Sequence, residues 1–261
     1  MFLARFSRMT TVWTACAVLA GVITTAPAAI WLGSQNCFRL GQNHPSGASQ
    51  SNKKAQLKTN FAANNMNLLQ EVMVTSEVAN VAPSGYYTKV SGLKGTSSYS
   101  EAYGFVYNAT ISGGIVDYSS SSFSRPPSGL LTWSGSGYFW AVNYHAAFDA
   151  TPNATEIQLL NNVYTYYKGR SGVNSVIIGG DFNRTATSSY FNNLKNAGCS
   201  SISPNVATSL NASGAYASPY DHFAWNPSLT SISGAYREEN EPVYWRNNVS
   251  DHVGIYARVI Y

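Results

Sequence analysis

The sequence predicts an α/β fold in which two packed mixed β-sheets are flanked by helices. Strand-like apolar runs outnumber helical patterns, and the two kinds alternate only in the second half of the chain, which favours packed layers over a single parallel sheet. Hydrophobic residues make up 44% of the 261 residues, enough for a sizeable core. Charged residues make up only 11%, against a usual level of about 25%, so each buried or strand-end charge is informative.

The expected strands are short apolar runs bounded by polar or glycine-containing segments. They cover residues 103–111, 129–133, 137–145, 174–180, 222–226 and 253–261. A helix expected at residues 53–64 precedes a buried run at 66–74. The clearest helix begins at Asn153 as N-cap, carries Glu156 at the capping-box position and ends at Gly169.

The N-terminus has the pattern of a secretory signal peptide. Arg5 and Arg8 precede an apolar stretch, and a small-residue cleavage site ends at Ala28. The stretch is short for a membrane span and lacks a stop-transfer flank, so we expect residues 1–28 to be removed. The prediction is an exported protein, secreted or periplasmic, with residues 29–261 as one domain and no stable membrane span.

Removal of residues 1–28 would leave 14 basic and 12 acidic residues, since the segment holds two arginines and no acid. This mild charge permits a polyanionic partner without requiring one. Of the three cysteines, Cys16 would leave with the signal. The remaining pair, Cys37 and Cys199, could form one disulfide in an exported protein, although the sequence leaves their separation open.

Polar and charged residues gather where predicted strands begin or end. Glu71, His145 and Asp181 follow apolar runs, while Asp221 and Asp251 precede them. Each alone is explained by turn or cap formation. Together they are unusual in a chain with so few charges, because an unpaired buried carboxylate needs a partner or an ion.

These residue types fit metal-assisted hydrolysis of a phosphoester. Oxygen ligands such as Glu71 and Asp251 suit Mg²⁺, with Ca²⁺ or Mn²⁺ as alternatives, whereas no cysteine or multi-histidine set suits zinc. Histidines such as His145 and His252, with carboxylates nearby, suit general acid and base chemistry near neutral pH.

Seven motifs follow one another along the chain: "NLLQEV", "SYSEAYGFVYN", "SFSRPP", "NYHAAFD", "GGDFNR", "AYASPYDHFAW" and "SDHVGIYARV". In this order they resemble the endonuclease/exonuclease/phosphatase superfamily, most closely its deoxyribonuclease I branch. The resemblance extends from about Asn43 to the C-terminus. The resemblance implies a four-layer sandwich, with the active site at one edge, that hydrolyses DNA phosphodiester bonds.

The resemblance also implies roles for individual residues. Glu71, Asp251 and, with a poorer match, Asn43 would bind the metal. His252 paired with Asp221 would be the general base, and His145 paired with Glu101 the general acid. Asp181 and Asn183 would hold the phosphate and orient the nucleophile, while Arg125, Tyr99 and Arg184 would contact the substrate.

Two alternatives stay open within this resemblance. The nuclease subunit of cytolethal distending toxins shares "GDFNR", including Arg184, and implies partner toxin subunits. It also lacks the groove arginine of the mammalian deoxyribonucleases, where this chain has Met73. A phosphohydrolase acting on phosphoinositides or sphingomyelin is the second alternative. A non-catalytic binding module is disfavoured because His145, Asp181, Asp251 and His252 are all present.

Overall fold

The computed structural model describes residues 29–96, 99–133, 137–237 and 241–260. The predicted signal segment, residues 1–28, lies outside this range. Among the described residues, no helix is long and apolar enough to cross a membrane.

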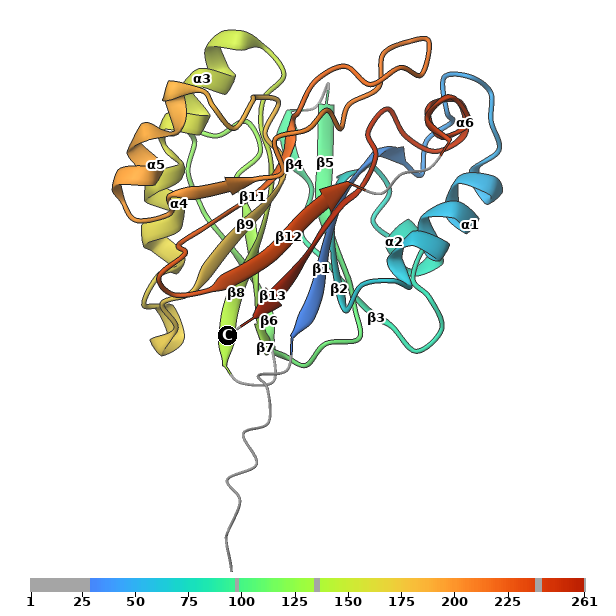
Figure 1. Ribbon diagram of the computed structural model, residues 1–261. Helices are drawn as coiled ribbons and strands as arrows, with labels where there is room; N and C mark the ends of the chain where they lie inside the picture. The colour runs from blue at the N-terminus through green and yellow to red at the C-terminus, as the bar shows by residue number, and fades with distance from the viewer. Residues whose placement is uncertain (1–28, 97–98, 134–136, 238–240, 261) are drawn as a thin grey trace, which may run out of the picture.

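Two β-sheets pack face to face in the middle of the molecule (Figure 1). The first has the strand order β12-β13-β1-β2-β5-β3, with β4 paired to β5. Its strands are β1 (Ile30–Leu40), β2 (Met66–Val72), β3 (Tyr87–Val90), β4 (Lys94–Thr96), β5 (Tyr99–Tyr107), β12 (Ser231–Arg237) and β13 (Ile255–Ile260). Within it, β1 and β2 run parallel.

The second sheet has the order β10-β11-β9-β8-β7-β6. Its strands are β6 (Ile111–Asp117), β7 (Ser128–Trp133), β8 (Tyr138–His145), β9 (Val176–Asp181), β10 (Ser201–Ser203) and β11 (Asp221–Trp225). Here β8 and β9 are the parallel pair. Both sheets are therefore mixed, as predicted.

Helices cover the outer face of each sheet (Figure 1). One side carries α1 (Gln50–Phe61), α2 (Glu77–Asn80) and α6 (Pro242–Asn248), and the other carries α3 (Ala150–Gln158), α4 (Leu160–Tyr167) and α5 (Asn192–Asn196). Short 3₁₀ turns lie at η1 (Arg170–Gly172) and η2 (Ser189–Phe191). The layer order is α/β/β/α, which confirms the predicted sandwich.

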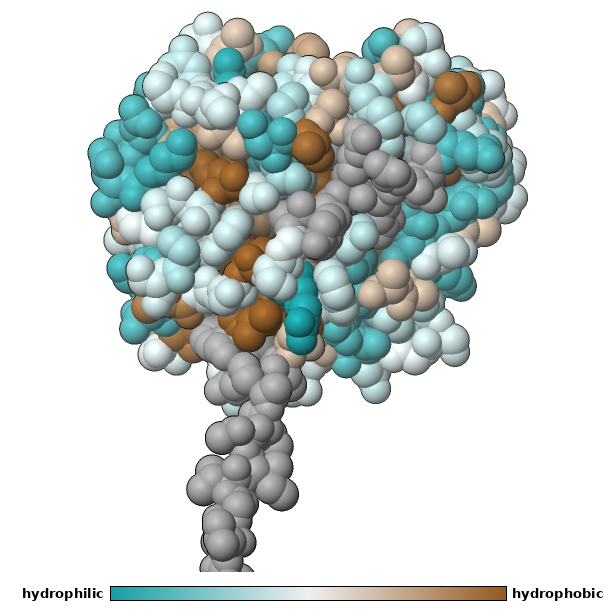
Figure 2. Space-filling view, in the orientation of Figure 1, coloured by the Kyte–Doolittle hydropathy of each residue, from teal (hydrophilic) through white to brown (hydrophobic). Residues whose placement is uncertain are grey.

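Alternation along the strands divides the buried side chains among three hydrophobic clusters. In β9, Ile177 faces the core between the sheets, whereas Val176 and Ile178 face the core under α3, α4 and α5. In β2, Leu68 faces the core between the sheets and Leu69 faces the core under α1 and α2. In the view of Figure 2, hydrophobic residues are scattered in separate patches over the visible surface of the molecule.

The helix predicted from Asn153 begins earlier and is broken. Asp149 is the N-cap of α3, and Leu159 separates α3 from α4. Asn153 does not cap because its buried Nδ2 donates to the carbonyls of Ala147 and Phe182, both at 2.9 Å. Glu156 likewise forms no capping box: its carboxylate accepts hydrogen bonds from the N–H groups of Ser124 and Ala147 and from the hydroxyl of Tyr144.

Cys37 and Cys199 are both free thiols, so the disulfide considered from the sequence is wrong. Cys37 is buried in the cluster under α1, and Cys199 in the cluster under α4. The two sheets lie between these clusters, so the thiols cannot approach bonding distance. Burial raises the pKa of Cys37 to about 12.

Candidate active site

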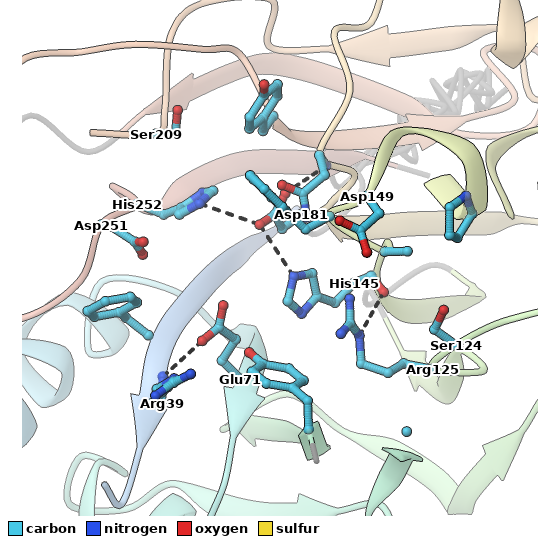
Figure 3. Close-up of a pocket in the computed structure, with 18 of the residues that line it drawn as sticks. Arg39, Glu71, Ser124, Arg125, His145, Asp149, Asp181, Ser209, Asp251 and His252 are labelled. Atoms are coloured by element: carbon cyan, nitrogen blue, oxygen red, sulfur yellow. Dashed lines mark hydrogen bonds and ion pairs between the residues drawn. The ribbon is translucent and has the colours of Figure 1, made fainter. Parts of the chain in front are cut away.

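A pocket of about 590 Å³ opens where strand ends of both sheets meet (Figure 3). β1 and β2 deliver Phe38 and Glu71 to it, and β8 and β9 deliver His145 and Asp181. β1 and β2 run parallel, and so do β8 and β9, so each pair brings two carboxyl ends to the edge of its sheet where the pocket lies. The predicted position of the site at one edge of the sandwich agrees with this geometry.

Asp181 lies at the centre of the polar groups. Its Oδ2 accepts a hydrogen bond from Asn36 Nδ2 at 3.0 Å and lies 3.6 Å from His145 Nε2 and 3.5 Å from His252 Nε2. Its Oδ1 accepts from the backbone N–H of Asn183 at 2.8 Å. Burial raises the pKa of Asp181, but the two histidines and these hydrogen bonds outweigh it and lower the pKa overall.

His252 and Asp221 form one histidine–carboxylate pair, with 2.7 Å between Nδ1 and Oδ2. Asp221 lies opposite Asp181 in the antiparallel pairing of β11 and β9. The His252 carbonyl accepts hydrogen bonds from Gln35 Nε2 and Trp245 Nε1, which fix the backbone. Burial lowers the pKa of His252, but Asp221 and Asp181 outweigh it and raise it well above 6.5.

His145 and Glu101 form the second pair, with 2.8 Å between Nδ1 and Oε1. His145 lies beside Asp181 in the parallel pairing of β8 and β9. Burial lowers the pKa of His145, but the fully buried Glu101 carboxylate outweighs it, so the net shift is upward. The two predicted pairs are thus formed, and both direct Nε2 at the same carboxylate oxygen.

Asn36, which the sequence analysis did not select, takes the place expected for Asn43. Asn43 is exposed and does not line the pocket. Asn36 is 1% exposed, and its Nδ2 also donates to Glu71 Oε1 at 3.1 Å. The strand that carries Asn36 reads "IWLGSQNCFRL", where polar residues interrupt the apolar pattern and conceal the strand. The available signal was an amide within this strand, followed by the bulky pair Cys37 and Phe38.

Glu71 and Asp251 fit a hard divalent cation, and Asn36 orients Glu71: its Nδ2 donates to Glu71 Oε1, while its Oδ1 accepts from the N–H of Phe38. Glu71 and Asp251 both line the pocket, and Asp251 Oδ1 is a buried oxygen without a hydrogen-bond partner. Burial raises the pKa of Asp251, and nearby Glu71 and Asp181 add to the rise, so a cation would relieve this charge. Carboxylate and amide oxygens are the donors that Mg²⁺ and Ca²⁺ prefer.

A second group of donors, Asp181, Asp221 and His252, has ligand atoms within 4.8 Å of one another. The short Asp221–His252 hydrogen bond occupies Nδ1 and Oδ2 of that group, although Asp221 Oδ1, like Asp251 Oδ1, is a buried oxygen without a hydrogen-bond partner. Glu71 and Asp251 line the pocket and Asp221 does not, which makes the Glu71 side the better cation position.

The backbone is strained on the same side of the pocket. Phe38, Arg39 and Glu71 have φ of 45°, 60° and 55°, a region that non-glycine residues rarely adopt. The N–H of Arg39 donates to Glu71 Oε2 at 3.1 Å, and the N–H of Phe38 donates to Asn36 Oδ1 at 2.9 Å. The strained backbone at Phe38 and Arg39 is thus fixed by hydrogen bonds to the side chains of Asn36 and Glu71.

The predicted substrate-binding residues divide into two groups. Tyr99, Arg125 and Asn183 line the pocket. Arg184 does not line it: Nε donates to Asn153 Oδ1 at 2.7 Å, and its guanidinium lies 5.1 Å from the ring of Tyr190. Arg184 therefore joins the turn after β9 to α3, and a substrate contact for it is not supported.

Solved structures share this fold. An endonuclease/exonuclease/phosphatase family protein from Bacteroides thetaiotaomicron matches with a TM-score of 0.63 at 14% identity, covering 90% of this chain and 98% of the other. ANGEL2, described as a 2′,3′-cyclic phosphatase, matches with a TM-score of 0.63 at 13% identity, covering 89% and 95%. The human Nocturnin catalytic domain matches with a TM-score of 0.60 at 12% identity, covering 89% and 94%.

No protein-family profile matches the sequence, and no curated protein matches it. The fold is nevertheless that of the endonuclease/exonuclease/phosphatase proteins, and the deoxyribonuclease I-like architecture fits it, as the resemblance implied. At these identities the likeness concerns the fold. What the site does is argued below from its own residues.

Proposed function

We propose that the protein is a divalent-metal-dependent phosphodiesterase that cleaves DNA as an exported endonuclease. One observation carries the proposal: two histidine–carboxylate pairs direct their Nε2 atoms at a single oxygen of Asp181, at 3.5 and 3.6 Å. Paired imidazoles on two sides of one point fit a reaction that needs a base and an acid in the same step. The description of ANGEL2, which has the same fold, as a cyclic phosphatase supports phosphoester chemistry.

His252 is the proposed general base. Its Nδ1 is hydrogen-bonded to Asp221, so Nε2 faces the pocket and can accept a proton from an attacking water. Asp221 stabilises the imidazolium that forms. Asp181 and Asn183, which line the same pocket, would orient the water and the phosphate.

His145 is the proposed general acid. Its pKa is raised, which favours the protonated imidazole that an acid needs, and Glu101 stabilises that form through the hydrogen bond at Nδ1. Nε2 would donate its proton to the leaving oxygen. A cation held by Glu71 and Asp251, with Asn36 orienting Glu71, would supply charge neutralisation for the phosphate oxygens.

Nicking of supercoiled plasmid in Mg²⁺, with and without EDTA, tests the proposal. His252→Ala should lower the rate at least about 100-fold, as expected when a general base is lost. Asp117→Asn, on the edge strand β6, serves as an exposed control and should leave the rate unchanged. Parental nicking by His252→Ala would exclude His252 as the base, and nicking that persists in EDTA would exclude the metal.

The same proteins assayed on a soluble inositol phosphate and on sphingomyelin test the lipid alternative. We expect DNA to be the better substrate. A kcat/KM on either lipid-type substrate equal to that on DNA would overturn this order. For the toxin-subunit alternative, Arg184 offers no substrate contact, since this half-buried side chain binds Asn153 of α3 and does not line the pocket.

A further inference from the structure

Two arginines line the described part of the pocket, and they are used differently. Arg125 is 8% exposed, with Nη2 donating to the Ala146 carbonyl at 2.5 Å and Nε lying 3.4 Å from Glu101 Oε1. Its guanidinium therefore supports the His145–Glu101 pair from inside the protein. This leaves it few donors for a substrate.

Arg39 has the opposite arrangement. The side chain is exposed, and its guanidinium has no hydrogen bond or ion pair with any described residue. It lies 5.8 Å from the centre of the Tyr99 ring, a cation–π contact that holds it at the pocket wall. The backbone N–H of Arg39 is fixed to Glu71, so the residue is anchored while its five donors stay free.

The charges around Arg39 have both signs. The Glu71 carboxylate accepts the Arg39 backbone N–H at 3.1 Å. Beside Arg39 in the chain, the Phe38 ring has Arg246 at 5.2 Å and Lys53 at 5.9 Å from its centre. On another side of the pocket Asp149 is exposed and makes no capping hydrogen bond at the start of α3. The unpaired Arg39 guanidinium therefore makes the end of β1 a better side for a second anion than the side at Asp149.

From this geometry we infer that Arg39 binds a second phosphate of the substrate, next to the one that is cleaved. The inference rests on the proposed function and narrows its substrate class to a polyphosphodiester strand, in preference to an isolated phosphodiester. The planar guanidinium suits bidentate binding of a phosphate.

Kinetics on two substrates test the inference. The parental protein and Arg39→Gln are compared on a short single-stranded oligonucleotide and on bis(p-nitrophenyl) phosphate, which has a single phosphate. The ratio of kcat/KM on the oligonucleotide to that on the small ester should fall about tenfold, mainly through KM, as expected for one lost charged hydrogen-bonded contact. The slope of log KM against log salt should fall by about 0.7.

Arg170→Gln is a matched control, since Arg170 is also exposed and lies 4.9 Å from a tyrosine ring, that of Tyr166, but does not line this pocket. Its ratio and salt slope should equal the parental values. Arg39→Lys should keep the salt slope while losing part of the affinity, because lysine preserves the charge without the planar fork.

A binding experiment separates this inference from the proposed function: the same oligonucleotide, labelled with a fluorophore, is titrated with protein in EDTA and its fluorescence anisotropy is measured. If Arg39→Gln binds with the parental affinity and salt slope while His252→Ala abolishes cleavage, the inference fails and the proposed function stands. If His252→Ala cleaves at the parental rate but Arg39→Gln binds more weakly, the proposed catalysis fails and the phosphate contact stands. The inference would also be overturned if Arg39→Gln had the same ratio of kcat/KM on the oligonucleotide to kcat/KM on the small ester as the parental protein.

Discussion

Asp181 links the protonation of both histidines. Its Oδ2 lies within 3.6 Å of His145 Nε2 and His252 Nε2, and the carboxylate raises the pKa of each imidazole while its own is lowered. These shifts favour the ionised Asp181 carboxylate and the protonated form of each histidine. As the proposed general base, His252 has to be neutral before it can accept a proton from water.

This linkage predicts how stability depends on pH. The folded pKa of His252 is raised above 6.5, so its contribution to stability is complete below 6.5 and is lost as pH rises through the raised value. Each unit of pKa difference contributes about 1.4 kcal/mol. In EDTA, the free energy of unfolding measured by urea titration should therefore decline as the pH rises above 6.5.

His252→Asn is the control for this pH dependence. It should show a smaller decline, because its side chain does not titrate. NMR titration of the His252 imidazole should give a midpoint above 6.5, and a midpoint at or below that value would contradict the interpretation.

Asn36 and Asn43 provide a second residue-scale prediction. Asn36→Ala removes the hydrogen bonds to Glu71 and Asp181, so kcat/KM should fall about 10- to 100-fold, as for other groups that orient metal ligands. Asn43→Ala should leave kcat/KM unchanged, because Asn43 is exposed outside the pocket. Equal effects of the two substitutions would show that Asn36 does not orient the site.

At the scale of elements, strand ends that follow strongly apolar runs were predictable and the first strand was not. The runs in β2, β8 and β9 placed Glu71, His145 and Asp181 correctly at strand ends. β1 is central in its sheet, yet Gly33, Ser34 and Gln35 interrupt its apolar pattern, so the expected site asparagine was placed at Asn43, seven residues after Asn36. Gln35 is polar because it holds the His252 carbonyl, a contact 217 residues away that no local pattern reveals.

Gly180 is required where β8 and β9 pair next to the site. Its φ is 150°, and a Cβ atom there would lie 1.7 Å from the carbonyl oxygen of Tyr144. Gly180→Ala should therefore destabilise the fold by more than about 3 kcal/mol, because the conflict is with backbone. Gly92→Ala meets no atom within 4 Å and should change stability by less than about 0.5 kcal/mol. Urea unfolding of both variants checks this, and a small effect at Gly180 would contradict the close approach.

At the scale of the whole molecule, the layers keep the outer cores apart. The sequence predicted the layers because alternating strands and amphipathic helices are local patterns. It could not predict the separation of Cys37 and Cys199, because that depends on which face of which sheet each residue occupies. The same limit applied to Arg184, whose partner Asn153 lies on a different element.

The cysteines give a test at this scale. In the chain from residue 29, both thiols should react with a thiol reagent only after denaturation, since both are fully buried. The melting temperature should be the same with and without a reducing agent. Loss of free thiols in the native protein, or a lower melting temperature on reduction, would indicate a disulfide.

Neither sheet holds a complete site. Asn36, Glu71 and Glu101 belong to the first sheet, while His145, Asp181 and Asp221 belong to the second. The hydrogen bonds from Asn36 to Asp181 and from Glu101 to His145 cross from one to the other. The alignment of the proposed acid and base thus depends on the packing between the sheets, in the cluster that holds Leu68, Ile177 and Phe223. If the proposed chemistry holds, shortening a side chain in that layer would shift the two histidines relative to each other and lower activity before it unfolded the protein.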